Sequence, residues 1–365
     1  MENAKTIDLI RVIVEVTDTL LGISTGLGHL QRKTIGYYTA ARHSLPSANS
    51  FPLLVCIGPM GTGKSECSRI VKAFAYKPRA MSLRGMSPPA FRDELVEAHN
   101  GTAVIEEADA GWKESKNYEN LLSDRYHRDS AKVAIKVPAG DNSWITQEKY
   151  FSGASVVHKR LPFADAALDG RSISVPFRAN HSRKYKEFRE NDPAVVELKK
   201  RVDNFTFDPP ELHRSFEAAG RILASYTPVL ALAEWCGDTE FLEQVVSWLQ
   251  SKTKQLVEDQ ATEPDGLVLR ALVERLSASG GSLVFHNVKL KDLRASIFAN
   301  FAVDLQPRQI AGLARELGFQ TKDSHGITVV VPTPKLLVAA CERVGYEDEE
   351  IAKLRKHLQE THLKP

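Results

Sequence analysis

The most specific chemistry in the sequence lies in one run of eight residues. From Gly58 to Ser65 the chain has the sequence Gly-Pro-Met-Gly-Thr-Gly-Lys-Ser, which matches the pattern G-x-x-x-x-G-K-[ST] at every fixed position. Glycines let backbone N–H groups wrap phosphate oxygens, and the start of a following helix adds partial positive charge. An apolar run at 52–57 predicts a buried strand before it, and 65–75 has a helical pattern after it. The run therefore predicts a loop that binds nucleotide phosphates.

Each polar residue of this loop has an expected role. Lys64 is expected to reach the β- and γ-phosphates, and the Ser65 hydroxyl to ligate Mg²⁺. ATP and Mg²⁺ are the predicted cofactors. The alternative to a phosphate-binding loop is a chance match to the pattern in a Gly-rich loop, and the predicted strand and helix on either side argue against it. The residues expected to contact the nucleotide are Gly58, Pro59, Met60, Gly61, Thr62, Gly63, Lys64, Ser65 and Glu66.

Acidic residues follow the apolar run at 102–105, which predicts a third buried strand. A neighbouring strand of a phosphate-loop protein brings such residues beside the metal and the attacking water. We expect Glu106 to hold Mg²⁺ and Glu107 to act as the general base. Asp is usual where Glu106 stands, and Asp109 could substitute in part. The alternative is a solvated acidic strand end.

The order of predicted elements indicates an α/β fold. Strands alternate with helices over residues 50–178, which is typical of a parallel sheet. The helices come at 7–25, 30–44, 65–75, 88–99 and 165–169, the further strands at 79–84, 154–158 and 172–177, and a hairpin at 132–151. Residues 183–260 have a helical pattern. Beyond them, a helix at 267–276, a strand at 282–288, helices at 289–301 and 307–317, and two strands around 324–326 predict a winged helix.

The motifs together resemble a known family. The phosphate loop, then GTAVIEEAD, NLLSDRYHR and FSGASVVHKRLPFADAALDGRSISVPF are similar to the AAA+ ATPases of plasmids, prophages and integrative elements, the helicase-like type associated with primases. The similarity covers roughly residues 35–330. It implies an N-terminal helical segment (1–45), an AAA+ parallel-sheet core (46–180), a helical lid (181–262) and a C-terminal winged-helix domain (263–365). It also implies a hexameric or other oligomeric assembly.

The same resemblance implies roles for four further residues. His158 or Lys159 occupies the sensor position after a core strand, where Asn or Thr is usual. Arg171 stands where such ATPases carry an arginine finger that enters the neighbouring subunit's ATP site, and an intramolecular salt bridge is its alternative role. Arg221 stands where a lid helix places an arginine on the γ-phosphate. Arg125 and Arg128 are further interface candidates, with exposure to solvent as the alternative.

Two regions are candidates for contact with DNA. In helicase-type AAA+ proteins an inserted hairpin grips the nucleic-acid backbone, and here Lys136, Trp144 and Lys149 supply charge and a stacking ring. Simple packing of the tryptophan is the alternative. Residues 266–343 hold ten Lys or Arg and six Asp or Glu. The expected contacts there are Arg308, Gln309 and Arg315 on the recognition helix and Lys322 on the wing, with protein contacts as the alternative.

Composition excludes several other classes. The 365 residues include 48 Lys or Arg and 46 Asp or Glu, so the net charge of +2 indicates no general affinity for polyanions. The four cysteines form no C-x-x-C pair, which argues against a zinc site or a disulfide framework. The apolar stretches are too short to cross a bilayer, and the N-terminus lacks the pattern of a signal peptide. We expect a cytoplasmic protein without a membrane partner.

The sequence thus predicts a ring-forming AAA+ ATPase that couples ATP hydrolysis to translocation or unwinding of DNA in the replication of a mobile element. Its expected partners are single- or double-stranded DNA, further copies of itself, and a primase or other replication protein. One alternative is an ATPase that assembles on DNA or recruits a partner without unwinding, as in transposition or initiation. Another is a protein-remodelling ATPase. A small-molecule kinase is disfavoured by the predicted C-terminal domain.

Overall fold

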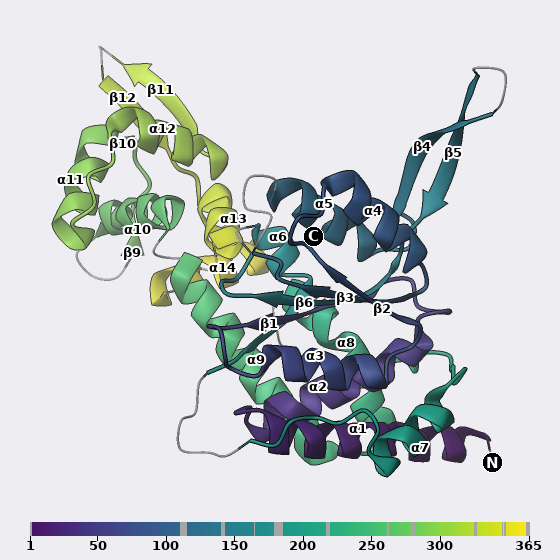
Figure 1. Ribbon diagram of the computed structural model, residues 1–365. Helices are drawn as coiled ribbons and strands as arrows, with labels where there is room; N and C mark the ends of the chain where they lie inside the picture. Colours follow the sequence, from purple (N-terminus) through teal and green to yellow (C-terminus); the bar gives the residue numbers. More distant parts are fainter. Residues whose placement is uncertain are drawn as a thin grey trace. The chain divides into compact units, whose positions relative to one another are not determined.

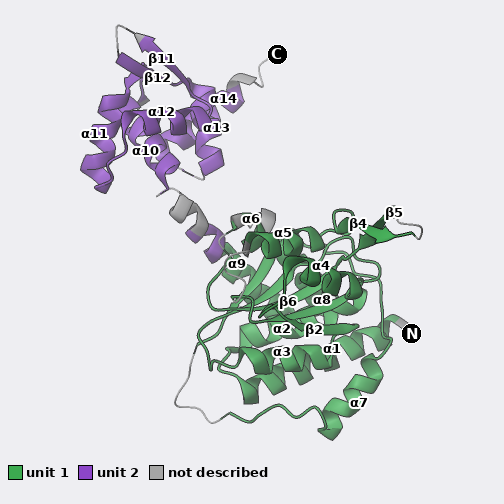
Figure 2. Cartoon of the chain, turned by 45° about the horizontal axis from the view of Figure 1, so that its top comes forward, with its two compact units in different colours: residues 1–250 green, residues 251–365 purple. Residues whose placement is uncertain are grey.

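The structure is a computed structural model, and the chain divides into a first unit, Met1–Gln250, and a second unit, Ser251–Pro365 (Figure 2). The boundary between them falls within one long helix, α9 (Thr239–Gln260). The structure describes residues 2–109, 115–139, 143–163, 165–178, 185–216, 220–260, 263–278, 282–324, 327–344, 346 and 348–362.

A five-stranded parallel sheet lies at the centre of the first unit. Its spatial order is β2-β3-β6-β1-β7, so β6 is inserted between β1 and β3. Near-continuous apolar runs suit strands that are buried on both faces. The predicted parallel α/β architecture is confirmed and is consistent with a phosphate-loop core. The strands are β1 (Leu53–Ile57), β2 (Pro78–Ser82), β3 (Gly101–Glu106), β6 (Gly153–Lys159) and β7 (Ser172–Pro176).

Helices cover both faces of this sheet (Figure 1). Successive side chains of a strand point to opposite faces. Leu54 and Cys56 pack on one face with the core of α1 (Glu2–Ser24), α2 (His29–Ala41), α3 (Lys64–Ala73), α7 (Pro193–Val202), α8 (Gly220–Trp235) and α9. Leu53 and Val55 pack on the other with α4 (Pro88–Glu97), α5 (Ser115–Arg125) and α6 (Ala166–Asp169).

The helices expected to form a separate lid instead share this core. Tyr37 of α2 stacks on Phe241 of α9, with ring centroids 4.9 Å apart. Lys33 of α2 forms an ion pair with Asp238 at 2.5 Å, and Ser225 of α8 donates to the Gly170 carbonyl at 2.7 Å. The predicted N-terminal segment and the first part of the predicted lid therefore belong to the unit that holds the sheet.

Helix α5 was absent from the elements predicted by sequence, and its last residue corrects an expectation. Arg125 is 1% exposed, so it is neither solvated nor available at an interface. Its guanidinium donates to the carbonyls of Ala98, Gly101 and Phe151. Six hydrogen bonds to backbone carbonyls account for its burial because a buried charge is tolerated only when it is well bonded.

The predicted hairpin is confirmed. It consists of β4 (Lys132–Pro138) and β5 (Trp144–Tyr150), which pair antiparallel from Lys132 opposite Tyr150 to Pro138 opposite Trp144. The two strands form their own sheet and extend away from the five-stranded sheet (Figure 1). The hairpin ends immediately before β6, so its foot lies at the amino end of the central strands.

The second unit combines helices with a three-stranded antiparallel sheet of order β10-β12-β11. The strand expected at 282–288 is broken: β9 (Ser282–Leu283) pairs with β8 (Ser277–Ala278), whereas β10 (Val288–Lys289) pairs with β12 (Ile327–Val331). The other elements are α10 (Pro264–Leu276), α11 (Leu290–Phe301), α12 (Pro307–Glu316), β11 (Gln320–Ser324), α13 (Pro334–Val344) and α14 (Glu349–His362). Helices α10 to α13 share one apolar core.

Among the described residues, no helix combines the length and the apolar character needed to cross a membrane.

Replacing the buried guanidinium tests its structural role. Arg125→Ala is expected to lower the free energy of unfolding by about 3 kcal/mol, because several buried carbonyls lose their donor. Chemical denaturation of the full chain measures this change. Lys116→Ala, at an exposed position of the same helix, is the matched control and should change stability by no more than about 0.5 kcal/mol. Equal stability of the two variants would contradict the assigned role.

Candidate functional site

The loop between β1 and α3 has a backbone that only glycine accepts readily. Gly61 and Gly63 have φ angles of 76° and 93°, in the left-handed region. A Cβ atom at Gly58 would lie 2.3 Å from the Phe177 carbonyl oxygen. Strand β1 ends at Ile57 and helix α3 begins at Lys64. The loop therefore curves over the amino end of α3, an arrangement that can wrap phosphate oxygens with backbone N–H groups.

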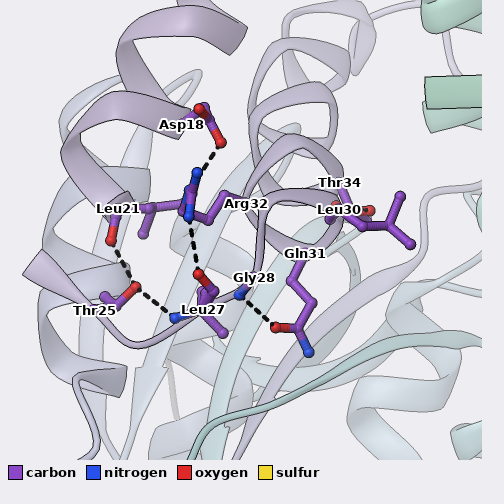
Figure 3. Close-up of polar contacts among 9 residues, drawn as sticks. All are labelled: Asp18, Leu21, Thr25, Leu27, Gly28, Leu30, Gln31, Arg32 and Thr34. Atoms are coloured by element: carbon purple, nitrogen blue, oxygen red, sulfur yellow. Dashed lines mark hydrogen bonds and ion pairs between the residues drawn. The ribbon is translucent and has the colours of Figure 1, made fainter. Parts of the chain in front are cut away.

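The turn between α1 and α2 supports this loop. A Cβ atom at Gly63 would meet the Thr25 methyl group at 3.3 Å. Thr25 is held by its own hydroxyl, which donates to the Leu21 carbonyl at 2.7 Å (Figure 3). Arg32 ties the turn to both helices, since it donates to Asp18 at 2.9 Å and to the Leu27 carbonyl at 3.0 Å. The N-terminal helices thus position the glycine loop from outside the sheet.

The ammonium group of Lys64 lies inside the curve of the loop. Its Nζ donates to the carbonyl oxygens of Gly58 and Pro59, both at 2.5 Å. Partial burial lowers the pKa of Lys64. The lysine is therefore a cation held at the place where the loop would enclose a phosphate.

A cavity of about 1110 Å³ opens in front of the loop. It lies at the carboxyl edge of the sheet, where ligands bind in open α/β folds. Five of its lining residues are cations and three are acids, so its walls favour a polyanion. The lining residues are Ser24, Met60, Gly61, Thr62, Gly63, Lys64, Ser65, Glu66, Arg84, Glu107, Asp109, His158, Lys159, Arg160, Arg178 and Tyr185. Most residues of the predicted loop thus line one cavity, and Gly58 and Pro59 do not.

Two of the three predicted acids face the cavity. Glu107 has a φ angle of 53°, uncommon for a residue with a side chain. Its carboxylate accepts from the Ser82 hydroxyl at 3.1 Å and pairs with Arg84 at 3.7 Å. Asp109 accepts from the Arg160 backbone N–H at 2.8 Å. Glu106 is half-buried and does not line the cavity, so of the residues predicted to serve the metal and the water, Ser65, Glu107 and Asp109 face it.

The sensor candidates lie at the end of β6, beside the loop. The His158 ring shares a hydrogen bond with the Ser68 hydroxyl of α3. Burial, with a smaller contribution from Lys64, lowers the pKa of His158 to about 4. His158 is therefore a neutral hydrogen-bonding group near pH 7. Lys159 pairs with Glu119 at 3.6 Å in a pair that is 12% and 14% exposed.

Of the two arginines predicted to act on phosphates, Arg171 does not line the cavity of its own chain. The guanidinium of Arg171 donates to the Ser123 carbonyl at 3.1 Å and lies 5.6 Å from the centre of the Tyr126 ring. It is thus held against α5, and its role toward a neighbouring subunit stays a prediction. Arg221 belongs to α8, but its side chain lies outside the described residues.

Sequence reasoning missed five lining residues. Arg84, Arg160 and Arg178 each follow a strand of the central sheet at its carboxyl end. That position is a signal which could have identified them. Tyr185 and Ser24 reach the cavity from segments outside the sheet and carried no such local signal.

The candidate DNA contacts are exposed, but they do not all share one surface. On the hairpin, Trp144 is 63% exposed, so it does not serve packing within the described chain. Lys136 and Trp144 lie on one face and Lys149 on the other, because residues paired across the two strands share a face. In the second unit, Arg308, Gln309, Arg315 and Lys322 are exposed. Two of them also stabilise α12: Gln309 accepts from the Gln306 N–H at 2.8 Å, and Arg315 donates to the Ala311 carbonyl at 3.0 Å.

No protein-family model matches the chain, and no curated protein matches it. Among solved structures, the chain is similar to the A-form apo structure of the NrS-1 C-terminal region, residues 305–718. The TM-score is 0.40 and the sequence identity 11%, over 87% of this chain and 75% of that chain. We therefore infer the function from the cavity and the surfaces of the chain itself.

The buried imidazole gives a pH-dependent stability. Because the pKa of His158 is about 4 in the folded chain and ordinarily about 6.5, its contribution is fully present above pH 6.5 and is lost as the pH falls toward 4. His158→Asn is expected to reduce the loss of unfolding free energy between pH 7 and pH 5 by up to about 2 kcal/mol. Denaturant titrations of both proteins at the two pH values measure this difference. An unchanged pH dependence in the variant would show that His158 does not titrate in this way.

Proposed function

We propose that this chain is an ATPase that binds Mg²⁺-ATP in the cavity at the carboxyl edge of its first unit. The observation that carries the proposal is the glycine loop curved around Lys64 at the start of α3, facing a cavity with cationic walls. A volume of about 1110 Å³ is ample for a nucleotide. The positive φ angles of Gly61 and Gly63, and the packing of Thr25 against Gly63, support a loop whose shape is already suited to phosphate.

The residues of the cavity then have distinct tasks. Lys64 and the loop N–H groups bind the phosphates, and Ser65 with Asp109 would hold the metal, which supplies charge neutralisation on the phosphate oxygens. Glu107 would take a proton from the attacking water as general base. Its contacts with Ser82 and Arg84 hold the carboxylate in place. His158 would contribute a neutral hydrogen bond.

We propose further that the ATPase acts on DNA as a ring, as a helicase-like AAA+ protein in the replication of a mobile element. Arg171 would complete the site of a neighbouring subunit, and Lys136 and Trp144 on the hairpin would contact the DNA. The second unit, with two helices before a β-hairpin and a third strand beside it, would serve as a winged helix that presents Arg308, Arg315 and Lys322. A hexameric assembly and a primase as partner belong to this proposal.

A second candidate is an ATPase that assembles on DNA without unwinding it. The position of Glu106 outside the cavity favours it, because the metal then has fewer carboxylate ligands than in the predicted site. Strand displacement by the purified chain distinguishes the two. ATP-dependent DNA binding without displacement would support the second candidate and overturn the first.

Loss of the loop lysine tests ATP binding. Lys64→Ala should reduce ATP affinity at least about tenfold and abolish hydrolysis, because the phosphates lose their partly buried cation. Calorimetric titration with a non-hydrolysable ATP analogue measures affinity, and phosphate release with and without DNA measures turnover. Lys72→Ala, near the other end of the same helix, is the control and should bind as the wild type does. Tight binding by Lys64→Ala would overturn the proposed site.

Arg171 is tested by mixing subunits. Arg171→Ala should retain ATP binding and lose most turnover, because an arginine finger acts on the neighbouring subunit's nucleotide. Mixing it with Lys64→Ala subunits should restore part of the ATPase rate, since some interfaces then join an intact loop to an intact arginine. Thermal unfolding of each variant checks that loss of the contact with Ser123 does not unfold the chain. Full activity of Arg171→Ala alone would exclude the role.

A further inference from the structure

A second cavity lies at the foot of the hairpin, at the opposite edge of the sheet from the candidate nucleotide site. Its volume is about 460 Å³, within the range of small-ligand sites. Two of its residues immediately precede β3 at its amino end, and two others are the first residue of β4 and the last of β5, which pair with each other. The cavity is lined by His99, Asn100, Arg128, Asp129, Lys132 and Tyr150.

Two cations, Arg128 and Lys132, line this cavity together with one acid, Asp129. Arg128 donates to the Leu45 carbonyl at 2.7 Å and to the Asn100 side-chain oxygen at 3.5 Å, which hold its guanidinium at the cavity wall. Lys132 is 3.6 Å from Glu148, in an ion pair whose side chains are 51% and 57% exposed. Such a surface pair contributes little, so Lys132 can exchange the carboxylate for a phosphate at small cost.

An aromatic surface lies beside these cations. The rings of His99 and Tyr150 have centroids 6.1 Å apart and planes inclined by 37°. Tyr150 is 48% exposed, whereas His99 is fixed by the Ser152 hydroxyl, 3.3 Å from its Nδ1. Burial, and then the charge of Arg125, lower the pKa of His99, so the ring is neutral at pH 7. The two rings offer a face on which a base can stack.

The hairpin connects this foot to its tip along one face. Lys132 pairs with Tyr150, Lys136 with Thr146 and Pro138 with Trp144, so these side chains share a face. At a rise of about 3.3 Å per residue, Lys136 lies about 13 Å beyond Lys132, and Trp144 lies about 20 Å from Tyr150. We call this surface the Lys132 face. The opposite face carries Val133, Ile135, Val137, Ile145, Gln147 and Lys149.

We propose that a single strand of nucleic acid lies along the Lys132 face, with one base against Trp144 and another on the His99–Tyr150 rings. Lys136, Lys132 and Arg128 contact its phosphates. Alternating cations and rings suit a single strand because its bases are free to stack, whereas a duplex offers mainly its backbone. The inference rests on the proposed action on DNA. It adds that the cavity at the foot of the hairpin, which we call the foot cavity, takes part in binding, and that the strand lies on the Lys132 face of the hairpin. It does not depend on ATP hydrolysis.

The test uses the full chain and fluorescein-labelled oligothymidine, with oligouridine and a DNA duplex as further probes. Lys132→Ala and Tyr150→Leu are each expected to weaken binding of oligothymidine about fivefold or more. Lys132→Ala should also reduce the slope of log affinity against log salt by about one, because one phosphate contact is lost. Glu148→Gln should tighten binding, since it frees Lys132. Unfolding midpoints check that each variant is folded.

Lys149→Ala is the matched control: the sequence places Lys149 among the expected DNA contacts, but in the structure it lies on the opposite face of the hairpin, so this change removes the same charge away from the Lys132 face. It is expected to bind oligothymidine within twofold of the wild type. Equal weakening by Lys149→Ala and Lys132→Ala would overturn the choice of face, and wild-type binding by both Lys132→Ala and Tyr150→Leu would overturn the foot cavity. Preference for the duplex over oligothymidine would also overturn the proposal. If the wild type binds no nucleic acid at all, the proposed action on DNA fails together with this inference. If the wild type binds but the variants do not weaken binding as expected, only this inference fails.

Discussion

One buried guanidinium fixes the arrangement on which both edges of the sheet depend. Arg125 donates to the carbonyls of Ala98, just before β3, of Gly101, the first residue of β3, and of Phe151, just before β6. Strand β6 can pass this close to β3 because residue 153 is a glycine. A Cβ atom there would lie only 2.5 Å from the Gly101 carbonyl oxygen and 2.5 Å from the Arg125 guanidinium. The bonds hold β6 beside β3, and β6 in turn pairs with β1. A cation of this kind stays buried only while all these carbonyls are in place.

The insertion of β6 between β1 and β3 gives each edge of the sheet its own chemistry. At the carboxyl edge it brings His158 and Lys159 to the glycine loop on one side and to Glu107 on the other. At the amino edge it places the foot of the hairpin beside Asn100.

The N-terminal helices are part of the same system. Thr25 contacts the position of Gly63, and Ser24 lines the cavity, so the loop rests on a turn that Arg32 closes. Helices α8 and α9 pack on α2 through contacts such as that of Tyr37 with Phe241. Residues 220–250 of the predicted lid thus pack in the same core as α2 and α3, on one face of the sheet.

Local patterns in the chain were enough to predict the glycine loop, the five core strands and the hairpin, because residue types close in sequence indicate each of them. Positive φ angles at Gly61 and Gly63 and the apolar runs of β1 and β6 are of this kind. Helix α5 escaped prediction because most of its residues are polar and its burial comes from distant partners. Likewise, no local signal showed that Arg125 is buried. The tertiary structure alone determined which acids face the cavity and which helices support the loop, since these depend on strand order and on long-range packing.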